Sequence, residues 1–205
     1  HASPELDTDT CVVAFFESTG TGSMAGVEII EIKFTGTPGG GHGAMPWYTI
    51  DPIMIAMNFG ITSQQIVSRR INLIDGPAVF TIGKIETSGF GAHNIIPESA
   101  TMMCTLRTFN PEARAEAMRL IKALAEAAAT PWGATASIHF GGTALPLMLD
   151  PATNDRCRAY AFNLFGSSAV KTAKIRTGAD SFATAAQHVK ASFWRLATGN
   201  KRLGI

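Results

Sequence analysis

Two segments that each place an N-cap residue before a proline most constrain how this chain can fold. Asp51-Pro52 and Asn110-Pro111 both set a capping side chain ahead of a proline that suits the first helical turn. Apolar residues at helical spacing follow each pair, which predicts helices over about 51–69 and 110–130. In the second helix these spaced residues are Ala117, Leu120, Ile121, Leu124 and Ala128.

Four strands are predicted around these two helices. Segments rich in β-branched and apolar residues cover 27–34, 79–86, 101–109 and 134–140. The resulting order is β-α-β-β-α-β, which is the split βαβ arrangement of ferredoxin-like folds. We therefore expect an α+β fold in which an antiparallel sheet carries both helices on one face.

The segments on either side have a different character. Asp150-Pro151 predicts a helix that ends near Gly166, and 191–197 predicts a strand, but this part has too few strands for a sheet of its own. We expect three parts: a partial α/β domain at 1–26, a compact module at 27–142, and a further piece of the α/β domain at 143–205. The chain opens on His1 rather than Met, which favours an internal fragment of a longer protein.

Charge and cysteine content exclude several classes of protein. Seventeen Lys and Arg stand against sixteen Asp and Glu, a net charge of +1, so no basic surface for nucleic acid or membrane is expected. With 46% hydrophobic and 16% charged residues, the chain is not of the disordered class. Cys11, Cys104 and Cys157 lie far apart and form neither a disulfide framework nor a zinc-finger pattern. The expected location is the reducing cytoplasm.

A glycine-rich loop holds the first candidate site residue. Gly39-x-Gly41-x-x-Ala44 matches a dinucleotide-binding pattern, but Pro46 interrupts the helix that such a site needs, and no acidic residue follows about 20 positions on. Nucleotide binding is therefore rejected. His42 stands between two glycines, so its ring can project toward a ligand or another subunit and donate a hydrogen bond to an oxyanion. A solvent-exposed turn histidine fits the same pattern.

Asn94 and Arg107 are the next candidates. Asn94 lies in a predicted loop, where its amide can donate to a carboxylate or a carbonyl. Arg107 lies near the end of a predicted strand among apolar neighbours, where its guanidinium needs a partner. On spacing alone, a local turn and an ordinary salt bridge are the favoured interpretation of this pair. His93 is interpreted only as a loop neighbour of Asn94.

Six short motifs stand in a fixed order along the chain. They are Gly40-Gly41-His42-Gly43-Ala44-Met45-Pro46, Asp51-Pro52, Gln65-Ile66-Val67-Ser68-Arg69, Gly83-Lys84-Ile85, Asn94-Ile95-Ile96-Pro97 and Leu106-Arg107-Thr108-Phe109. Taken together they resemble the M20 metallopeptidase family, and within it the aminoacylase and hippurate-hydrolase branch of amidohydrolases. The similarity runs from His1 to about Asn200 and is densest between Ile30 and Phe140.

This resemblance implies a two-domain enzyme that hydrolyses N-acyl amino acids. Its catalytic α/β domain, represented by 1–26 and 143–205, would hold two divalent metal ions, zinc or manganese. Its ferredoxin-like lid, at 27–142, would form a homodimer. By the same resemblance, His42 would reach across the dimer to polarise the scissile carbonyl. Asn94 and Arg107 would hold the substrate carboxylate, and His1 would be a metal ligand.

The chain departs from the family pattern in its metal ligands. The family's Asp-Met-Asp segment, Cys-Gly-His pair and paired glutamates would all precede His1, and the last metal histidine would follow Asn200. Asp180-Ser181 replaces the Glu-Asp of a family motif, which leaves Asp180 without an assigned role. One histidine cannot hold two hydrolytic metals, so this chain is expected to be inactive alone.

Two alternatives to a hydrolase fragment remain open. A non-catalytic dimerisation or ligand-binding module that kept the lid and lost the metal centre explains the missing ligands without truncation. A free-standing ferredoxin-like regulatory domain explains 27–140 but leaves the C-terminal segment unexplained. Cys-Gly-His and Glu-Glu motifs in the coding sequence directly upstream would separate the hydrolase from the non-catalytic module.

Overall fold

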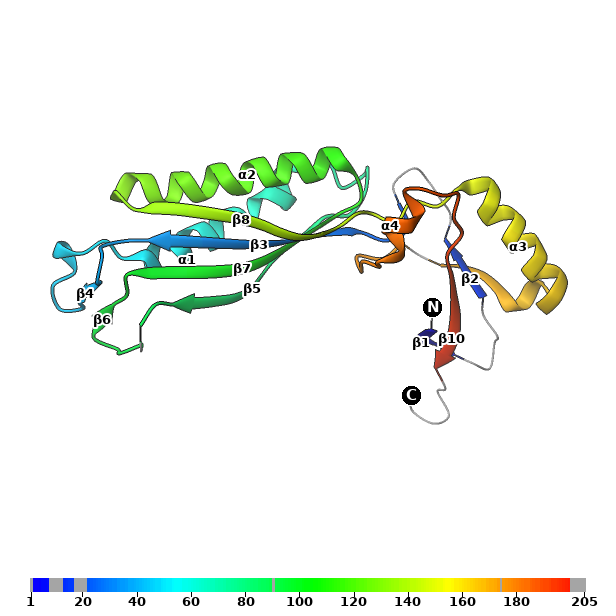
Figure 1. Cartoon of the computed structure of the whole chain (residues 1–205), viewed down its shortest axis with the longest axis horizontal. Coiled ribbons are helices and arrows are strands. Elements are labelled where there is room, and N and C mark those ends of the chain that lie inside the picture. Colours follow the sequence, from blue (N-terminus) through cyan, green and yellow to red (C-terminus); the bar gives the residue numbers. More distant parts are fainter. Residues whose placement is uncertain (1, 8–12, 17–21, 90, 174, 200–205) are drawn as a thin grey trace. The chain divides into compact units, whose positions relative to one another are not determined.

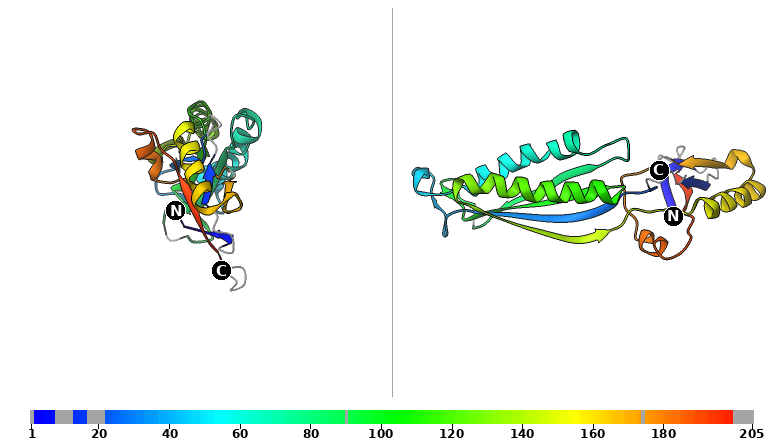
Figure 2. Two further views of the ribbon diagram at one scale, coloured as in Figure 1. Left: turned by 90° about the vertical axis from the view of Figure 1, so that its right-hand side faces the viewer. Right: turned by 90° about the horizontal axis from the view of Figure 1, so that it is seen from above.

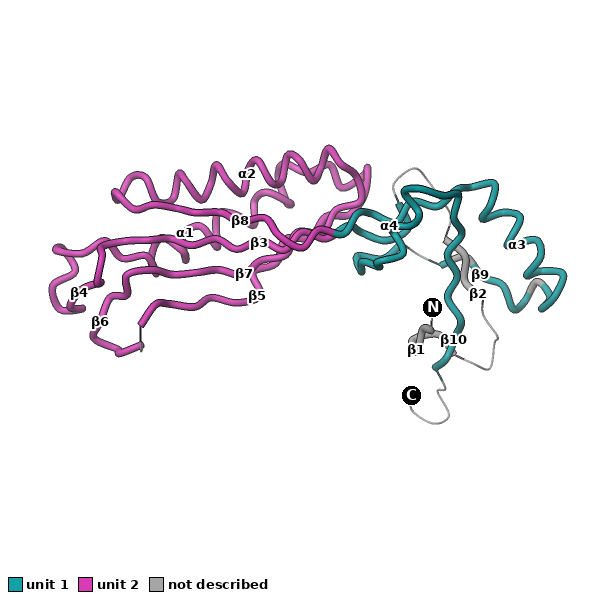
Figure 3. The backbone as a smooth tube through the Cα atoms, viewed as in Figure 1, with its two compact units in different colours: residues 1–26, 144–205 teal, residues 27–143 magenta. Residues whose placement is uncertain are grey.

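The chain folds into two compact units. The computed structural model describes residues 2–7, 13–16, 22–89, 91–173 and 175–199 (Figure 1). Unit 1 combines His1–Gly26 with Ala144–Ile205, and unit 2 is Val27–Thr143 (Figure 3). None of the helices in the described residues is long and apolar enough to cross a membrane.

Unit 2 is built on a four-stranded sheet. Its strands are β3 (Gly26–Thr35), β5 (Val79–Thr87), β7 (Ser99–Thr108) and β8 (Thr135–Ala144), in the spatial order β5-β7-β3-β8. β5 runs antiparallel to β7, with Val79 opposite Arg107 and Thr87 opposite Ala100. The predicted combination of helices with an antiparallel sheet is therefore confirmed, although β8 extends four residues beyond the predicted strand.

Two helices cover one face of this sheet. α1 (Pro52–Ser63) and α2 (Pro111–Ala129) both pack against β7 and against each other, so they share a face (Figure 2). The predicted caps are confirmed: the Asp51 carboxylate accepts a hydrogen bond from Ile53 N, and Asn110 Oδ1 accepts one from Ala113 N. Both bonds satisfy amides that have no partner within the helix.

α1 ends earlier than the sequence pattern predicts. A π-helical turn, η2 (Ile66–Arg70), follows it in place of the expected continuation to about residue 69. Thr62 and Ser63 donate their hydroxyl hydrogens to the carbonyls of Asn58 and Gly60. Such side-chain bonds compete with the regular backbone ladder and weaken it where the helix ends.

The core of unit 2 lies between the helices and the sheet. Along β3, Ile30, Ile32 and Phe34 are fully buried, while the residues between them are exposed. This alternation follows from the two-residue repeat of a strand and shows which face meets the helices. Cys104 on β7 points into the same core, and burial raises the pKa of its thiol to about 12.

A buried ion pair ties three elements of unit 2 together. Glu28 on β3 is only 2% exposed and accepts hydrogen bonds from Arg114 of α2, with Nε at 2.6 Å and the terminal nitrogen at 2.5 Å. Thr143 at the end of β8 donates to its other carboxylate oxygen at 2.9 Å. Each carboxylate oxygen therefore has a partner, as a buried charge requires.

Unit 1 contains a second, mixed sheet. Its strands are β1 (Ala2–Asp7), β2 (Val13–Phe16), β9 (Val170–Ala173) and β10 (Trp194–Gly199), in the order β1-β10-β2-β9. The C-terminal segment does have too few strands by itself, and β1 and β2 from the other end of the chain complete the sheet. α3 (Pro151–Phe165) and α4 (Phe182–Ala186) belong to this unit.

Candidate functional site

A short two-stranded ribbon brings His42 and Asn94 together. β4 (Gly41–His42) pairs antiparallel with β6 (Ile95–Ile96) (Figure 1). In this pair His42 lies opposite Ile95. Gly43 N donates a hydrogen bond to the Asn94 carbonyl at 2.7 Å. The sequence predicts plain loops for both segments, because neither has the length or alternation of a strand.

Glycines allow the two segments of this ribbon to approach so closely. Gly40 has a φ of +70°, and a side chain there would overlap the Ile96 carbonyl oxygen. A Cβ on Gly43 would lie 3.1 Å from the Asn94 carbonyl oxygen. The glycine-rich loop is thus explained by backbone contact within the protein, since only glycine combines a positive φ with such close approach.

The His42 ring is held by one of its two nitrogens. Ala44 N donates a hydrogen bond to His42 Nδ1 at 3.1 Å, so Nδ1 acts as an acceptor. In the neutral ring this contact assigns the proton to Nε2. His42 is exposed, and it therefore presents an Nε2–H donor to whatever binds at the ribbon.

Asn94 offers a second donor on the neighbouring segment of the ribbon. It is exposed, its backbone carbonyl is occupied by Gly43, and its side-chain amide makes no hydrogen bond to any other described residue. The amide NH2 of Asn94 and the Nε2–H of His42 are both neutral donors. Each of them suits an oxygen that carries negative charge, such as the carbonyl oxygen of an amide or a carboxylate.

Arg107 lies on the four-stranded sheet, near the end of β7 that is farther from the ribbon. It sits opposite Val79 near the end of β7, and buried Leu106 and Thr108 flank it, which puts its side chain on the sheet face away from the helices. Ser99 at the start of β7 is eight residues away, or about 26 Å at the rise of an extended strand. Within one copy, Arg107 is therefore too far from the ribbon to share a small ligand with His42.

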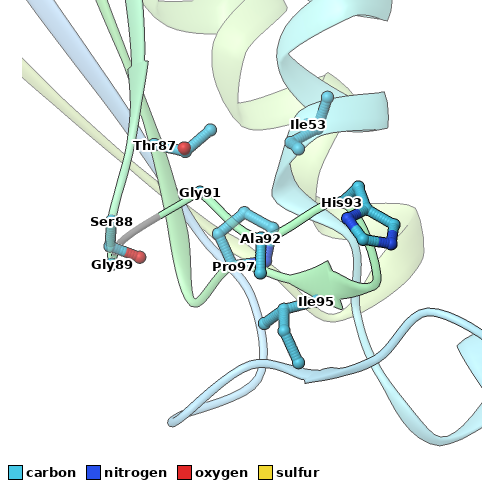
Figure 4. A pocket seen from close by; sticks show the side chains of 9 residues that line it. All are labelled: Ile53, Thr87, Ser88, Gly89, Gly91, Ala92, His93, Ile95 and Pro97. Carbon is cyan, nitrogen blue, oxygen red and sulfur yellow. The ribbon is translucent and has the colours of Figure 1, made fainter.

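A pocket opens beside the ribbon. It has a volume of about 570 Å³ and is enclosed by the start of α1, the end of β5, the loop that follows and β6 (Figure 4). The residues that line it are Ile53, Thr87, Ser88, Gly89, Gly91, Ala92, His93, Ile95 and Pro97. His93 was predicted only to be a loop neighbour of Asn94. The available signal was its place between Asn94 and two nearby glycines, which is a weak one.

The described residues do not form a metal site. No group of three or more His, Cys, Asp and Glu side chains that could hold a metal ion occurs among them. His1, the predicted metal ligand, lies outside the described residues. Asp180 accepts a hydrogen bond from Phe182 N at 2.8 Å at the start of α4, which indicates a structural role.

Comparison with known proteins identifies the central part of the chain. The sequence model of the family described as "Peptidase dimerisation domain" matches residues 26–133. IAA-amino acid hydrolase ILR1-like 4 of Arabidopsis thaliana is 33% identical over 133 residues, which are 65% of this chain and 29% of that protein. N-acetyl-L-cysteine deacetylase of Bacillus subtilis (strain 168) is 29% identical over 170 residues, 83% of this chain and 39% of that protein.

Solved structures show the same fold. An aminohydrolase from methicillin-resistant Staphylococcus aureus superposes with a TM-score of 0.81 at 21% identity, over 97% of this chain and 49% of that one. The Bacillus subtilis YXEP protein, described as a dinuclear metal binding peptidase from the M20 family, superposes with a TM-score of 0.73 at 23% identity. The match covers 97% of this chain and 46% of that one. The chain thus spans less than half the length of each of these four relatives.

Proposed function

Because the chain belongs to the M20 peptidase family, we propose that it is part of an amidohydrolase that cleaves the amide bond of N-acyl amino acids. The observation that carries this proposal is the ribbon, which pairs the backbone of the His42 segment with that of the Asn94 segment and leaves His42 exposed with an Nε2–H donor. Two of the similar proteins are named for substrates with an acyl group on an amino acid nitrogen, which supports the same substrate class.

In this proposal His42 acts on the scissile carbonyl. Its Nε2–H donates to the carbonyl oxygen and strengthens that bond as negative charge develops there during attack by water. Ala44 holds Nδ1 and so keeps the ring in the tautomer that can donate. Asn94 adds a second donor from the same ribbon and, as the family resemblance implies, helps to hold the substrate carboxylate.

Arg107 supplies the cation for the substrate carboxylate, and this role requires two copies of the chain. A guanidinium pairs with a carboxylate through two parallel hydrogen bonds, which fixes the orientation of the amino acid. Arg107 lies about 26 Å along β7 from the end that carries the ribbon. One small substrate meets all three residues only if the ribbon comes from one copy and Arg107 from the other.

We place the contact between the two copies at β5. This strand is an edge of the sheet, so its outer backbone groups are open to pairing. Lys84 and Glu86 form an ion pair on its outer face. If β5 pairs antiparallel with β5 of a second copy about Ile85, each Lys84 lies opposite the second copy's Glu86, which makes the edge self-complementary in charge.

Apolar side chains next to this edge support the same contact. Met57 and Ile61 on α1 are 52% and 75% exposed, and Ile85 on β5 is 52% exposed. They line a groove of about 540 Å³ between the helix and the strand. The opposite edge, β8, exposes polar side chains instead: Thr135, Ser137 and His139. A second copy would therefore bury apolar surface at β5 and little at β8.

The order of strands and helices in unit 2 supports the ferredoxin-like lid that the sequence predicts. The four strands and two helices follow one another as β3-α1-β5-β7-α2-β8, with both helices on one face. We assign unit 2 as this lid, and we assign both segments of unit 1 to the catalytic domain of the same enzyme.

The proposed enzyme depends on two divalent metal ions, zinc or manganese. The described residues do not fit a metal site, so no step is derived through these ions. His1 is the one ligand proposed from this chain, which we regard as a fragment that is inactive alone. Cys104 and Cys157 are both free thiols, which agrees with the proposed cytoplasmic location.

Hydrolysis by the full-length protein tests the proposal. We expect release of the free amino acid from N-acyl amino acids in the presence of zinc or manganese. His42→Ala should lower kcat about a hundredfold, the usual effect of losing an oxyanion donor. His139→Ala, at an exposed histidine on β8, is the matched control and should leave kcat unchanged.

The intact mass of the protein from its natural source complements this assay. A mass near twice 21.7 kDa would support a hydrolase of which this chain is a fragment. A mass of 21.7 kDa, together with no hydrolysis at any metal tested, would leave the non-catalytic dimerisation module as the better explanation. An unchanged kcat in His42→Ala would remove His42 from the mechanism.

A further inference from the structure

A further pocket of unit 2 lies between the start of α1 and the residues that follow α2. It has a volume of about 520 Å³ and shares no lining residue with the pocket beside the ribbon. The residues that line it are Pro46, Thr49, Ile50, Asp51, Met54, Ile55, Asn58 and Trp132. We infer that this pocket binds a small organic cation, namely an amine attached to an aromatic or other apolar body. None of its residues has a role in the proposed hydrolysis, so the inference is independent of it.

Two short 3-10 turns bring the walls of this pocket together. The turn η1 (Pro46–Tyr48) and the residues after it lead into α1, and the turn η3 (Thr130–Trp132) follows α2. A Cβ on Gly133 would lie 3.7 Å from Ile50 Cδ1, so η3 ends against the segment that leads into α1. The pocket is therefore built within unit 2 from segments that are far apart in the sequence.

Trp132 is the aromatic group in the pocket. It is 65% exposed, and its ring contacts no other ring or cation in the described part of the chain. Gly133 fixes the backbone beside it, since this residue has a φ of +71° and donates a hydrogen bond to the Thr130 carbonyl at 3.1 Å. Met54, which is 60% exposed, adds a second apolar surface. An exposed indole in such a place can stack on a flat apolar group and attract a cation over its face.

Asp51 is the charged group in the pocket. Its Oδ1 accepts hydrogen bonds from Ile53 N at 2.9 Å and Met54 N at 3.4 Å. Among the residues that the structure describes, no donor or cation contacts its Oδ2. The start of a helix carries only about half a positive charge, so the carboxylate keeps a net negative character. An ammonium group at Oδ2 would therefore form a charge-assisted hydrogen bond with a side chain that the cap already holds in place.

The remaining polar groups favour a cation over an anion. No Lys, Arg or His is among the described residues that line the pocket, so a carboxylate or phosphate would meet the Asp51 charge without any compensating cation. The side chains of Thr49 and Asn58 each offer an oxygen that can accept from an ammonium group. Neither side chain makes a hydrogen bond to another described residue.

The volume of the pocket and its apolar surface call for more than an ammonium group alone. About 520 Å³ lies within the 300–1,000 Å³ typical of sites for whole small ligands. Ile55 in the lining is 3% exposed, whereas Trp132 and Met54 are open to solvent. A ligand with an aromatic or aliphatic body would cover this apolar surface while its amine reaches Asp51.

Titration of the full-length protein, labelled with nitrogen-15, with phenethylamine tests the inference. The indole N–H signal of Trp132, assigned by its loss in Trp132→Leu, should shift to saturation with a Kd of about 1 mM or lower. The neutral analogue 2-phenylethanol should bind about tenfold more weakly, and the anion 3-phenylpropionate should not shift the signal. No saturable shift with phenethylamine, or an equal response to 3-phenylpropionate, would overturn the inference. Hydrolysis plays no part in this measurement, so its failure would leave the proposed function standing.

Asp51→Asn separates the charge of the pocket from its structure. Asparagine is also a good N-cap, so α1 should keep its cap while the pocket loses its charge. The affinity for phenethylamine should fall about tenfold, to that of 2-phenylethanol, whose own affinity should not change. Asp150→Asn, the same substitution at the N-cap of α3, is the matched control and should alter neither affinity. Unchanged binding of phenethylamine to Asp51→Asn would overturn the inference.

Trp132→Leu keeps the inference testable if Asp51→Asn fails to fold. Trp132 is exposed, so its replacement should leave the fold intact. Calorimetric titration of this variant should show that phenethylamine and 2-phenylethanol both bind severalfold more weakly, because both lose the aromatic surface. Unchanged affinities for both compounds would overturn the inference.

Discussion

Removing Arg114 should destabilise the protein far more than removing an exposed arginine. Glu28 is 2% exposed, whereas the Arg114 side chain is 35% exposed, so Arg114→Met leaves a buried carboxylate without its cation. An unpaired buried charge costs about 3–5 kcal/mol. We expect the free energy of unfolding to fall by about 3 kcal/mol, near the lower end of this range. Thr143 still donates one hydrogen bond to Glu28, and the space left by the partly exposed Arg114 side chain lets water reach the carboxylate.

Urea unfolding followed by circular dichroism measures this loss, and hydrogen exchange of the amides in β3 and α2 assigns it to unit 2. The control is Arg119→Met on the same helix, whose ion pair with Glu116 is exposed and should contribute little. Adding Glu28→Gln to Arg114→Met removes the unpaired charge, so the double variant should be more stable than Arg114→Met alone. If Arg114→Met unfolds at the same urea concentration as Arg119→Met, the buried pair does not stabilise unit 2 and the reasoning is refuted.

Three further predictions follow from single groups. Ile85→Asp at the β5 edge should convert the proposed dimer to a monomer in sedimentation analysis, and Ile74→Asp in an exposed turn should not; an unchanged dimer would contradict the proposed interface. Cys104 should resist thiol reagents at pH 8 until the protein unfolds, because burial raises the pKa of its thiol to about 12; labelling of the native protein, detected by mass spectrometry, would disprove this. The Asp150 pKa is lowered by hydrogen bonds from Thr153, so its carboxylate stabilises the start of α3 above about pH 4. This contribution is lost as the pH falls through the lowered pKa, and the gap in urea midpoint between wild type and Asp150→Asn should therefore narrow from pH 7 to pH 3; a constant gap would argue against it.

The glycine-rich loop matches a known sequence pattern but has a different structural role in this fold. Its spacing resembles a phosphate-binding loop, yet Gly40 and Gly43 face the backbone of the segment around Asn94. The glycines allow the two backbone segments to approach closely. This close approach positions His42, which lies among the glycines. A substitution at Gly40 would therefore displace the backbone of the ribbon directly, and the side chains of the candidate site would move only as a consequence.

The sequence by itself determined the local elements of this protein. Asp51 and Asn110 cap the two helices of unit 2 because a side-chain oxygen next to the first turn needs no distant partner. The β-branched and apolar residues of 27–34 predicted the strand β3, since this signal lies in consecutive residues. The order of strands and helices in unit 2 followed from these local signals alone.

Only the tertiary structure decided which distant residues meet. The pairing of β4 with β6 depends on backbone hydrogen bonds between segments that carry no strand pattern, so His42 and Asn94 could not be joined from spacing. Arg107 looked like their partner in sequence, but the length of β7 separates it from them. The second sheet unites strands from both ends of the chain, and the pocket at His93 is formed by a helix and a loop that only folding brings together. Contacts of this kind depend on chain topology, which short-range patterns do not encode.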